Sequence, residues 1–220
     1  MSNNLFLRIL SSVILTPLCF YIIYKGSFYF IFFLLICSII IILESKKLVS
    51  SKMYFLLLLG FISFSVFCVY SIRNFYADNE TKSIIIFFGV LLISISTDIG
   101  GYVFGKIIGG KKLTKISPNK TYSGMMGSFI LSTLFSYFFL ELTDMFPSLK
   151  LNSVNMLIFI LLISLISQIG DIIISFFKRK SKIKNTGNII PGHGGLLDRI
   201  DGMIFAFPFG YLLLSLEILK

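Results

Sequence analysis

Seven long apolar stretches divide the sequence, and they constrain the fold more than any other feature. A helix needs about 20 residues to cross the hydrocarbon core of a bilayer, and each stretch is near that length. Short segments that contain most of the charged residues separate them. We therefore predict an all-α, polytopic integral membrane protein with about seven transmembrane helices, within a range of six to eight. The stretches cover residues 5–24, 28–43, 53–72, 83–99, 124–142, 154–177 and 203–219.

The composition excludes other classes of fold. Of the 220 residues, 56% are hydrophobic and only 14% are charged, whereas a soluble domain is about half apolar and a quarter charged. The same apolar content excludes a disordered chain. The three cysteines lie singly within apolar stretches and lack the spacing of metal ligands, so we interpret them as small buried side chains.

The basic residues predict which helix ends face the cytoplasm. If the N-terminus is cytoplasmic and all seven stretches cross, 15 of the 20 lysines and arginines fall in cytoplasmic segments. Cytoplasmic loops carry an excess of these residues, which favours this orientation. The sequence shows no targeting extension, so we expect a multi-pass protein of the cell inner membrane.

The chain divides into two parts that differ in residue type. Residues 1–90 have the character of scaffold helices in a membrane, whereas 13 of the 17 glycines lie between Gly100 and Gly202. We predict a catalytic membrane region at 91–220. It includes two loops rich in glycine and lysine, 105–123 and 178–202, which the predicted orientation places in the cytoplasm.

Four carboxylates lie in or at the edge of the predicted membrane helices of the second part. A charged side chain at the centre of a bilayer costs at least about 2.5–3.5 kcal/mol on insertion scales, so it marks a function and needs a partner. Asp171, Ser175 and Lys178 stand at i, i+4 and i+7, which places them on one face of a helix. Asp98 and Lys106, eight residues apart, repeat this arrangement. The four acids are Asp98, Asp171, Asp198 and Asp201.

Acids and cations that converge in this way suit phosphate chemistry with a magnesium ion. Mg²⁺ takes oxygen ligands, commonly one or two carboxylates plus substrate phosphates, and lysine or arginine binds other phosphate oxygens. Glycines allow the backbone to approach a phosphate closely. The GxxxxGK[ST] pattern is absent, which excludes a P-loop NTPase. The basic residues lie in short loops rather than on one aromatic-rich face, so we expect no nucleic-acid binding.

The second part of the sequence contains a long motif and three shorter companions. The stretch between residues 175 and 201 contains Ser175, Lys178-Arg179, Pro191-Gly192-His193-Gly194-Gly195 and Asp198-Arg199-Ile200-Asp201. The companion motifs are Asp98 with Gly105-Lys106, Ser117-Pro118-Asn119-Lys120-Thr121, and Gly170-Asp171. These motifs resemble those of phosphatidate cytidylyltransferases, also called CDP-diacylglycerol synthases. The resemblance covers roughly residues 94–205 and is most specific between residues 175 and 201.

The resemblance implies a nucleotidyltransferase of phospholipid biosynthesis that converts CTP and phosphatidate to CDP-diacylglycerol and pyrophosphate. It implies Mg²⁺ as cofactor and leaves a second cation open. The partners would be CTP, phosphatidate and membrane lipid, and a homodimer is left open. Carried over by position, the catalytic residues are Asp171, Asp198, Lys178 and Arg179. The substrate-binding residues are Lys106, Lys120, Ser175, His193, Gly194, Gly195 and Arg199. The metal ligands are Asp171, Asp198, Asp201 and Asp98.

Two departures from the family pattern keep other functions open. Asn185 stands where the family usually carries aspartate, and Ser123 stands where it usually carries glutamate. A non-catalytic relative would fit these changes. A transporter for an anionic lipid or solute would use similar buried charges, but the acids lie in one half of the chain and no internal repeat is visible. A CTP-dependent lipid kinase would instead transfer the γ-phosphate.

Overall fold

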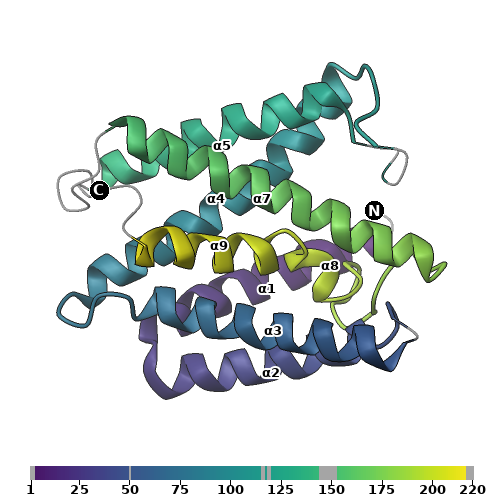
Figure 1. The fold of residues 1–220 in the computed structure, drawn as a ribbon, viewed down its shortest axis with the longest axis horizontal. Helices are drawn as coiled ribbons and strands as arrows, with labels where there is room; N and C mark the ends of the chain where they lie inside the picture. Colours follow the sequence, from purple (N-terminus) through teal and green to yellow (C-terminus); the bar gives the residue numbers. More distant parts are fainter. Residues whose placement is uncertain (1–2, 50, 115–116, 118–119, 144–152, 217–220) are drawn as a thin grey trace.

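The protein is a bundle of helices in the computed structural model, which describes residues 3–49, 51–114, 117, 120–143 and 153–216. The predicted all-α class is confirmed for this part of the chain (Figure 1). Its helices are α1 (Asn3–Lys25), α2 (Ser27–Ser45), α3 (Lys52–Arg73), α4 (Glu80–Ile107), α5 (Tyr122–Leu142), α7 (Ser153–Lys180), α8 (Leu197–Ile200) and α9 (Met203–Ser215).

Each predicted apolar stretch forms a helix. Among the described helices, six are long and apolar enough to cross a membrane, namely α1 to α5 and α7. The protein is therefore a multi-pass membrane protein. The seventh stretch was predicted to span 203–219, but its described helix α9 has 13 residues and is shorter than a span. The fourth stretch, predicted at 83–99, continues to Ile107 as part of α4.

Close packing against α5 explains why α4 continues through its glycines. A Cβ atom at Gly100 would lie 2.5 Å from the carbonyl oxygen of Gly127, and one at Gly124 would lie 2.6 Å from that of Gly101. Small residues allow membrane helices to approach each other in this way. The sequence linked the glycine enrichment to phosphate binding, but these four glycines serve helix packing.

Two alanine substitutions on α4 are expected to change stability in opposite directions. At Gly100 the added methyl group meets backbone atoms of α5, so Gly100→Ala should cost about 1–3 kcal/mol through overpacking. At Gly89 no atom lies within 4 Å of the added methyl group, so Gly89→Ala should stabilise the helix by about 0.5–1 kcal/mol. Thermal unfolding of the two variants in detergent checks this. A higher melting temperature for Gly100→Ala would contradict the packing.

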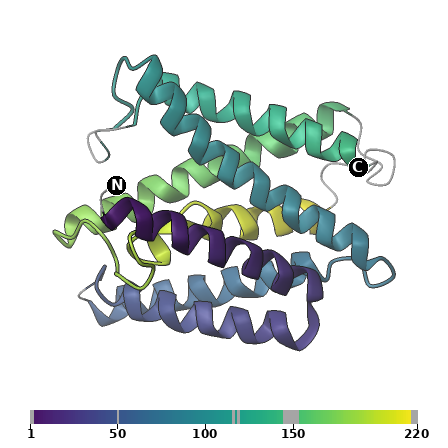
Figure 2. The ribbon, with the colours of Figure 1, turned by 180° about the vertical axis from the view of Figure 1, so that it is seen from behind.

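The basic loops gather at one end of the bundle. In Figures 1 and 2, the turn after α2, the segment after α4 and the segment between α7 and α8 lie at the same end. The turns that follow α1 and α3 lie at the opposite end. The alternation agrees with the topology predicted from charge. That the basic end faces the cytoplasm stays a prediction.

Polar contacts hold both ends of α1 against the bundle. At one end Arg73, whose side chain is only 1% exposed, donates to the carbonyl oxygens of Ile23 and Tyr24 at 2.7 and 3.0 Å. At the basic end, Arg8 donates to the carbonyl oxygen of Gly192 at 2.7 Å. Ser11 also donates to that of Pro191, at 3.2 Å. The first helix is thus fixed to the glycine-rich loop 190–195.

Candidate active site

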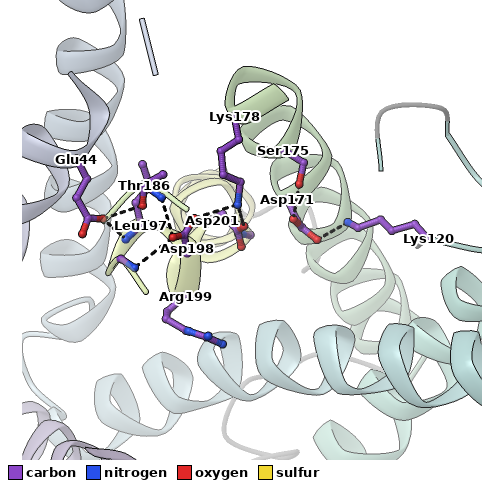
Figure 3. A network of polar contacts seen from close by, with 12 residues as sticks. Glu44, Lys120, Asp171, Ser175, Lys178, Thr186, Leu197, Asp198, Arg199 and Asp201 are labelled. Atoms are coloured by element: carbon purple, nitrogen blue, oxygen red, sulfur yellow. Dashed lines mark hydrogen bonds and ion pairs between the residues drawn. The ribbon is translucent and has the colours of Figure 1, made fainter. Parts of the chain in front are cut away.

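The face of α7 predicted from spacing is confirmed. Ser175 donates from Oγ to Oδ1 of Asp171 at 3.2 Å, one helical turn away. One turn further, Nζ of Lys178 lies 3.1 Å from Oδ1 of Asp198 and 3.6 Å from Oδ2 of Asp201. This face of α7 therefore points at the junction of α8 and α9 (Figure 3).

Three carboxylates from different segments meet beside this face. The side chains of Asp171 and Asp201 lie within hydrogen-bonding reach of each other. Asp98 of α4 is close enough for its charge to interact with both of them. Lys120, from the segment before α5, forms an ion pair with Asp171. Residues 98, 120, 171 and 201 are far apart in the sequence, so the fold itself assembles this cluster.

Burial and the facing carboxylate of Asp171 raise the pKa of Asp201 to about 8, while the charge of Lys178 acts in the opposite direction. The charged form of Asp201 is thus disfavoured in the absence of a cation. A divalent cation bound between the two carboxylates would relieve their repulsion.

Asp201→Asn is expected to stabilise the metal-free protein. The pKa rises from 3.8 in the unfolded chain to about 8 in the fold, so the acid opposes folding increasingly as pH rises through that interval. Asparagine removes this cost. The melting temperature of the variant should equal that of the wild type near pH 4 and exceed it most near pH 8, as measured in detergent with a chelator. A lower melting temperature than wild type at pH 8 would show that the acid pair is stabilising.

Asp198 is held by the loop that precedes α8. Its Oδ2 accepts hydrogen bonds from the backbone of Thr186 at 2.9 Å and of Gly195 at 3.2 Å, and its Oδ1 faces Lys178. The resemblance implies a metal ligand at this position. In the structure Asp198 is bound by the backbone of this loop, whereas Asp171 and Asp201 face each other. The role of Asp198 as a ligand stays a prediction.

Glu44, at the end of α2, is a site residue that the sequence did not predict. It is 2% exposed, and its carboxylate accepts from Thr186 Oγ1 at 3.0 Å and from the backbone of Leu196 and Leu197 at 3.1 and 2.8 Å. A Cβ atom at Gly195 would lie 2.6 Å from this carboxylate. A helix that the sequence assigned to the scaffold thus holds the loop that binds Asp198. The only signal was an acid directly after an apolar stretch.

The glycine-rich loop 190–195 forms hydrogen bonds with both α1 and α8. Nδ1 of His193 lies 3.0 Å from Oγ of Ser11 on α1. Arg199 donates from Nη2 and Nε to the carbonyl oxygen of His193, at 2.6 and 3.1 Å. Gly194 has a φ of +92°, a conformation that favours glycine, and a Cβ there would lie 3.3 Å from Asp198. The structure thus brings these predicted substrate-binding residues close to Asp198 through one loop.

Other predicted residues lie away from the cluster. Nζ of Lys106 lies 3.4 Å from the hydroxyl of Tyr102 on the exposed side of α4. Arg179 is exposed at the end of α7, and Asn185 is also exposed. Within the described part of the chain, no side-chain hydrogen bond or ion pair links these residues to the acids, and their roles stay predictions. Residues 118–119 of the motif at 117–121 lie outside the described residues.

A polar pocket of about 260 Å³ opens beside Asp171. Asp98, Lys120, Asp171 and the backbone and side chains of neighbouring residues on α4, α5 and α7 line it. In the described residues no three acidic, histidine or cysteine side chains are arranged to hold a metal by themselves. Two facing carboxylates with room for phosphate oxygens fit magnesium, which commonly takes only one or two protein carboxylates.

Comparison with known proteins agrees with this chemistry. The model of the cytidylyltransferase family matches residues 55–217. The phosphatidate cytidylyltransferase of Bacillus subtilis (strain 168) is 40% identical over 122 residues, which cover 55% of this chain and 44% of the relative. That of Staphylococcus aureus (strain COL) is 35% identical over 157 residues, which cover 68% and 59%. The chain therefore spans about half the length of the curated relatives it matches. It belongs to the cytidylyltransferase family.

Proposed function

We propose that the protein is a phosphatidate cytidylyltransferase, which converts CTP and phosphatidate to CDP-diacylglycerol and pyrophosphate. The observation that carries the proposal is the cluster of Asp98, Asp171 and Asp201 with Lys120 and Lys178 beside a polar pocket. The relatives in Bacillus subtilis and Staphylococcus aureus are phosphatidate cytidylyltransferases, and this activity supplies the proposed substrates. Neither the family match nor these relatives favour a transporter or a lipid kinase.

The reaction requires neutralisation of the negative charge on the phosphates more than it requires a proton transfer. A phosphate oxygen of phosphatidate, already ionised near pH 7, attacks the α-phosphorus of CTP. The bond from that phosphorus to the bridging oxygen breaks, and pyrophosphate leaves with the electron pair. Fixed cations stabilise the charge that develops. Lys120 and Lys178 lie on either side of the acids and are placed to bind phosphate oxygens.

The proposed magnesium ligands are Asp171 and Asp201, with Asp98 close by. When bound, the ion would neutralise and orient the nucleotide phosphates. Asp198 would keep the loop and Lys178 in position through its contacts with Thr186 and Gly195.

We also propose that the site lies at the cytoplasmic face of the cell inner membrane. Three segments that contribute to the site lie at the end of the bundle where the basic loops gather (Figures 1 and 2). They are the turn after α2, next to Glu44, the segment after α4, which contains Lys120, and the segment between α7 and α8, which binds Asp198. Positive residues favour the cytoplasmic side. CTP is a polar, cytosolic nucleotide, whereas the acyl chains of phosphatidate stay in lipid. A site at the end of the helices gives access to both. A homodimer stays a prediction.

The test is an assay of the purified protein with phosphatidate, magnesium and CTP labelled at either the α- or the γ-phosphorus. Cytidylyl transfer places the α label in the lipid product and the γ label in pyrophosphate. A lipid kinase would place the γ label in the lipid instead. No labelled lipid with either substrate, from protein that remains folded, would overturn the proposed function.

A further inference from the structure

A large apolar cavity lies under α1, on the other side of α8 from the acids. Its volume is about 400 Å³, within the range of about 300–1,000 Å³ of ligand sites. Its walls include Cys19 of α1, Phe30 and Cys37 of α2, and Phe207 of α9. Protein interiors are packed as densely as organic crystals, so we expect a cavity of this size to hold a bound molecule. Its apolar walls offer water too few partners.

The cavity communicates with the outer surface of the bundle. Leu15, Phe20 and Ile95 line it and are also 39%, 47% and 37% exposed. α1 covers the cavity, and the polar contacts of Arg8 and Arg73 hold that helix at its two ends. Entry of a flexible apolar chain from the bilayer would thus take place between these two contacts.

The short helix α8 connects the cavity to the acid cluster. Leu196, Arg199 and Ile200 line the cavity, whereas Asp198 and Asp201 face Lys178. In Figure 3, Arg199 points away from the side of α8 on which Lys178 lies. The cavity thus has one cationic residue, Arg199, in a mostly apolar wall. This distribution complements an amphiphile with an anionic head and an apolar tail.

We propose that this cavity holds one acyl chain of the phosphatidate whose phosphate reacts at the acid cluster, with Arg199 on the path of the lipid between the two. The inference rests on the proposed function and adds a binding site to it. The part of the cavity wall that α1 and α2 form precedes residues 55–217, which match the model of the cytidylyltransferase family. Moving a chain from the bilayer into the cavity exchanges one apolar environment for another. The cavity therefore positions the lipid more than it adds affinity.

A pair of tryptophan substitutions on α2 tests the position of the chain. Cys37→Trp fills the cavity, whereas the matched control Ile36→Trp adds the same bulk to a side chain that is 42% exposed on the outer face. With dioleoyl phosphatidate, Cys37→Trp should lower kcat/KM about tenfold or more, and with dihexanoyl phosphatidate about twofold or less. Ile36→Trp should leave both values near wild type. An equal loss of activity on both lipids, or none on either, would overturn the proposal.

Photo-cross-linking of the wild-type protein decides the question without a variant. The probe is phosphatidate with a diazirine at the end of one acyl chain, and the labelled residues are identified by mass spectrometry. We expect labels on cavity residues such as Cys19 and Cys37, and few from the matched phosphatidylcholine probe. Labels confined to outward residues such as Ile36, or equal labelling by phosphatidylcholine, would contradict a substrate site. If the wild type makes no CDP-diacylglycerol, the proposed function fails, while the cross-links still show whether the cavity binds phosphatidate.

Discussion

Asp171→Asn is expected to lower kcat by roughly 10²–10³-fold, the size of effect seen when one fixed charge-stabilising group is removed from an active site. Asp171 faces Asp201, pairs with Lys120 and accepts from Ser175. Asparagine keeps the shape of the side chain but removes its negative charge, so both Lys120 and the proposed metal ion lose their partner. The measurement is the initial rate with saturating CTP, phosphatidate and magnesium.

Ser175→Ala is the matched control on the same face of α7. It removes one hydrogen bond to Asp171, which is worth about 0.5–1.5 kcal/mol, so the rate should fall by about tenfold or less. Gel filtration and thermal unfolding show that both variants are folded. If folded Asp171→Asn protein kept more than a tenth of the wild-type rate, Asp171 would have no essential role.

Glu44→Ala is expected to impair both stability and activity. The carboxylate accepts three hydrogen bonds in a buried place, and its loss costs about 1–3 kcal/mol for each donor that stays buried without a partner. The donors belong to the loop that also holds Asp198, so the loop and Lys178 should lose their fixed positions. Thermal unfolding in detergent and kcat/KM, measured well below the melting temperature, report the two effects.

Two further variants separate these effects from a general loss of charge. Glu141→Ala removes an exposed glutamate on α5 and should change neither stability nor rate. Glu44→Gln keeps one acceptor oxygen, so it should lose less stability than Glu44→Ala. Wild-type stability and activity in Glu44→Ala would mean that the loop holds its shape without α2.

The helices and the shared face of α7 could be predicted from the sequence, because they depend on local geometry. The spacing of Asp171, Ser175 and Lys178 places them on one face of any α-helix, and the structure has that face. The apolar stretches predicted the helices for the same reason, because hydrophobic length is a local property. The glycines at positions 100 and 101 were less informative. They are compatible with a loop, and only the contact with α5 shows that they belong inside a helix.

Long-range contacts could not be predicted from one sequence. Glu44 binds Leu196 and Leu197 across more than 150 residues, and nothing near Glu44 indicates that partner. The contact between His193 and Ser11 on α1 is equally remote. The sequence suggested that separate acidic faces converge, and the structure specifies which: Asp171 faces Asp201, while Asp198 is bound by its own loop.

The central claim is that Asp171 and Asp201 share one divalent cation. Electron paramagnetic resonance of Mn²⁺ tests it directly, with CTP present and phosphatidate absent. We predict one bound Mn²⁺ per chain that Mg²⁺ displaces, and a loss of affinity of about tenfold or more in both Asp171→Asn and Asp201→Asn. Ser175→Ala should bind as the wild type does. Unchanged Mn²⁺ affinity in both aspartate variants would contradict the claim.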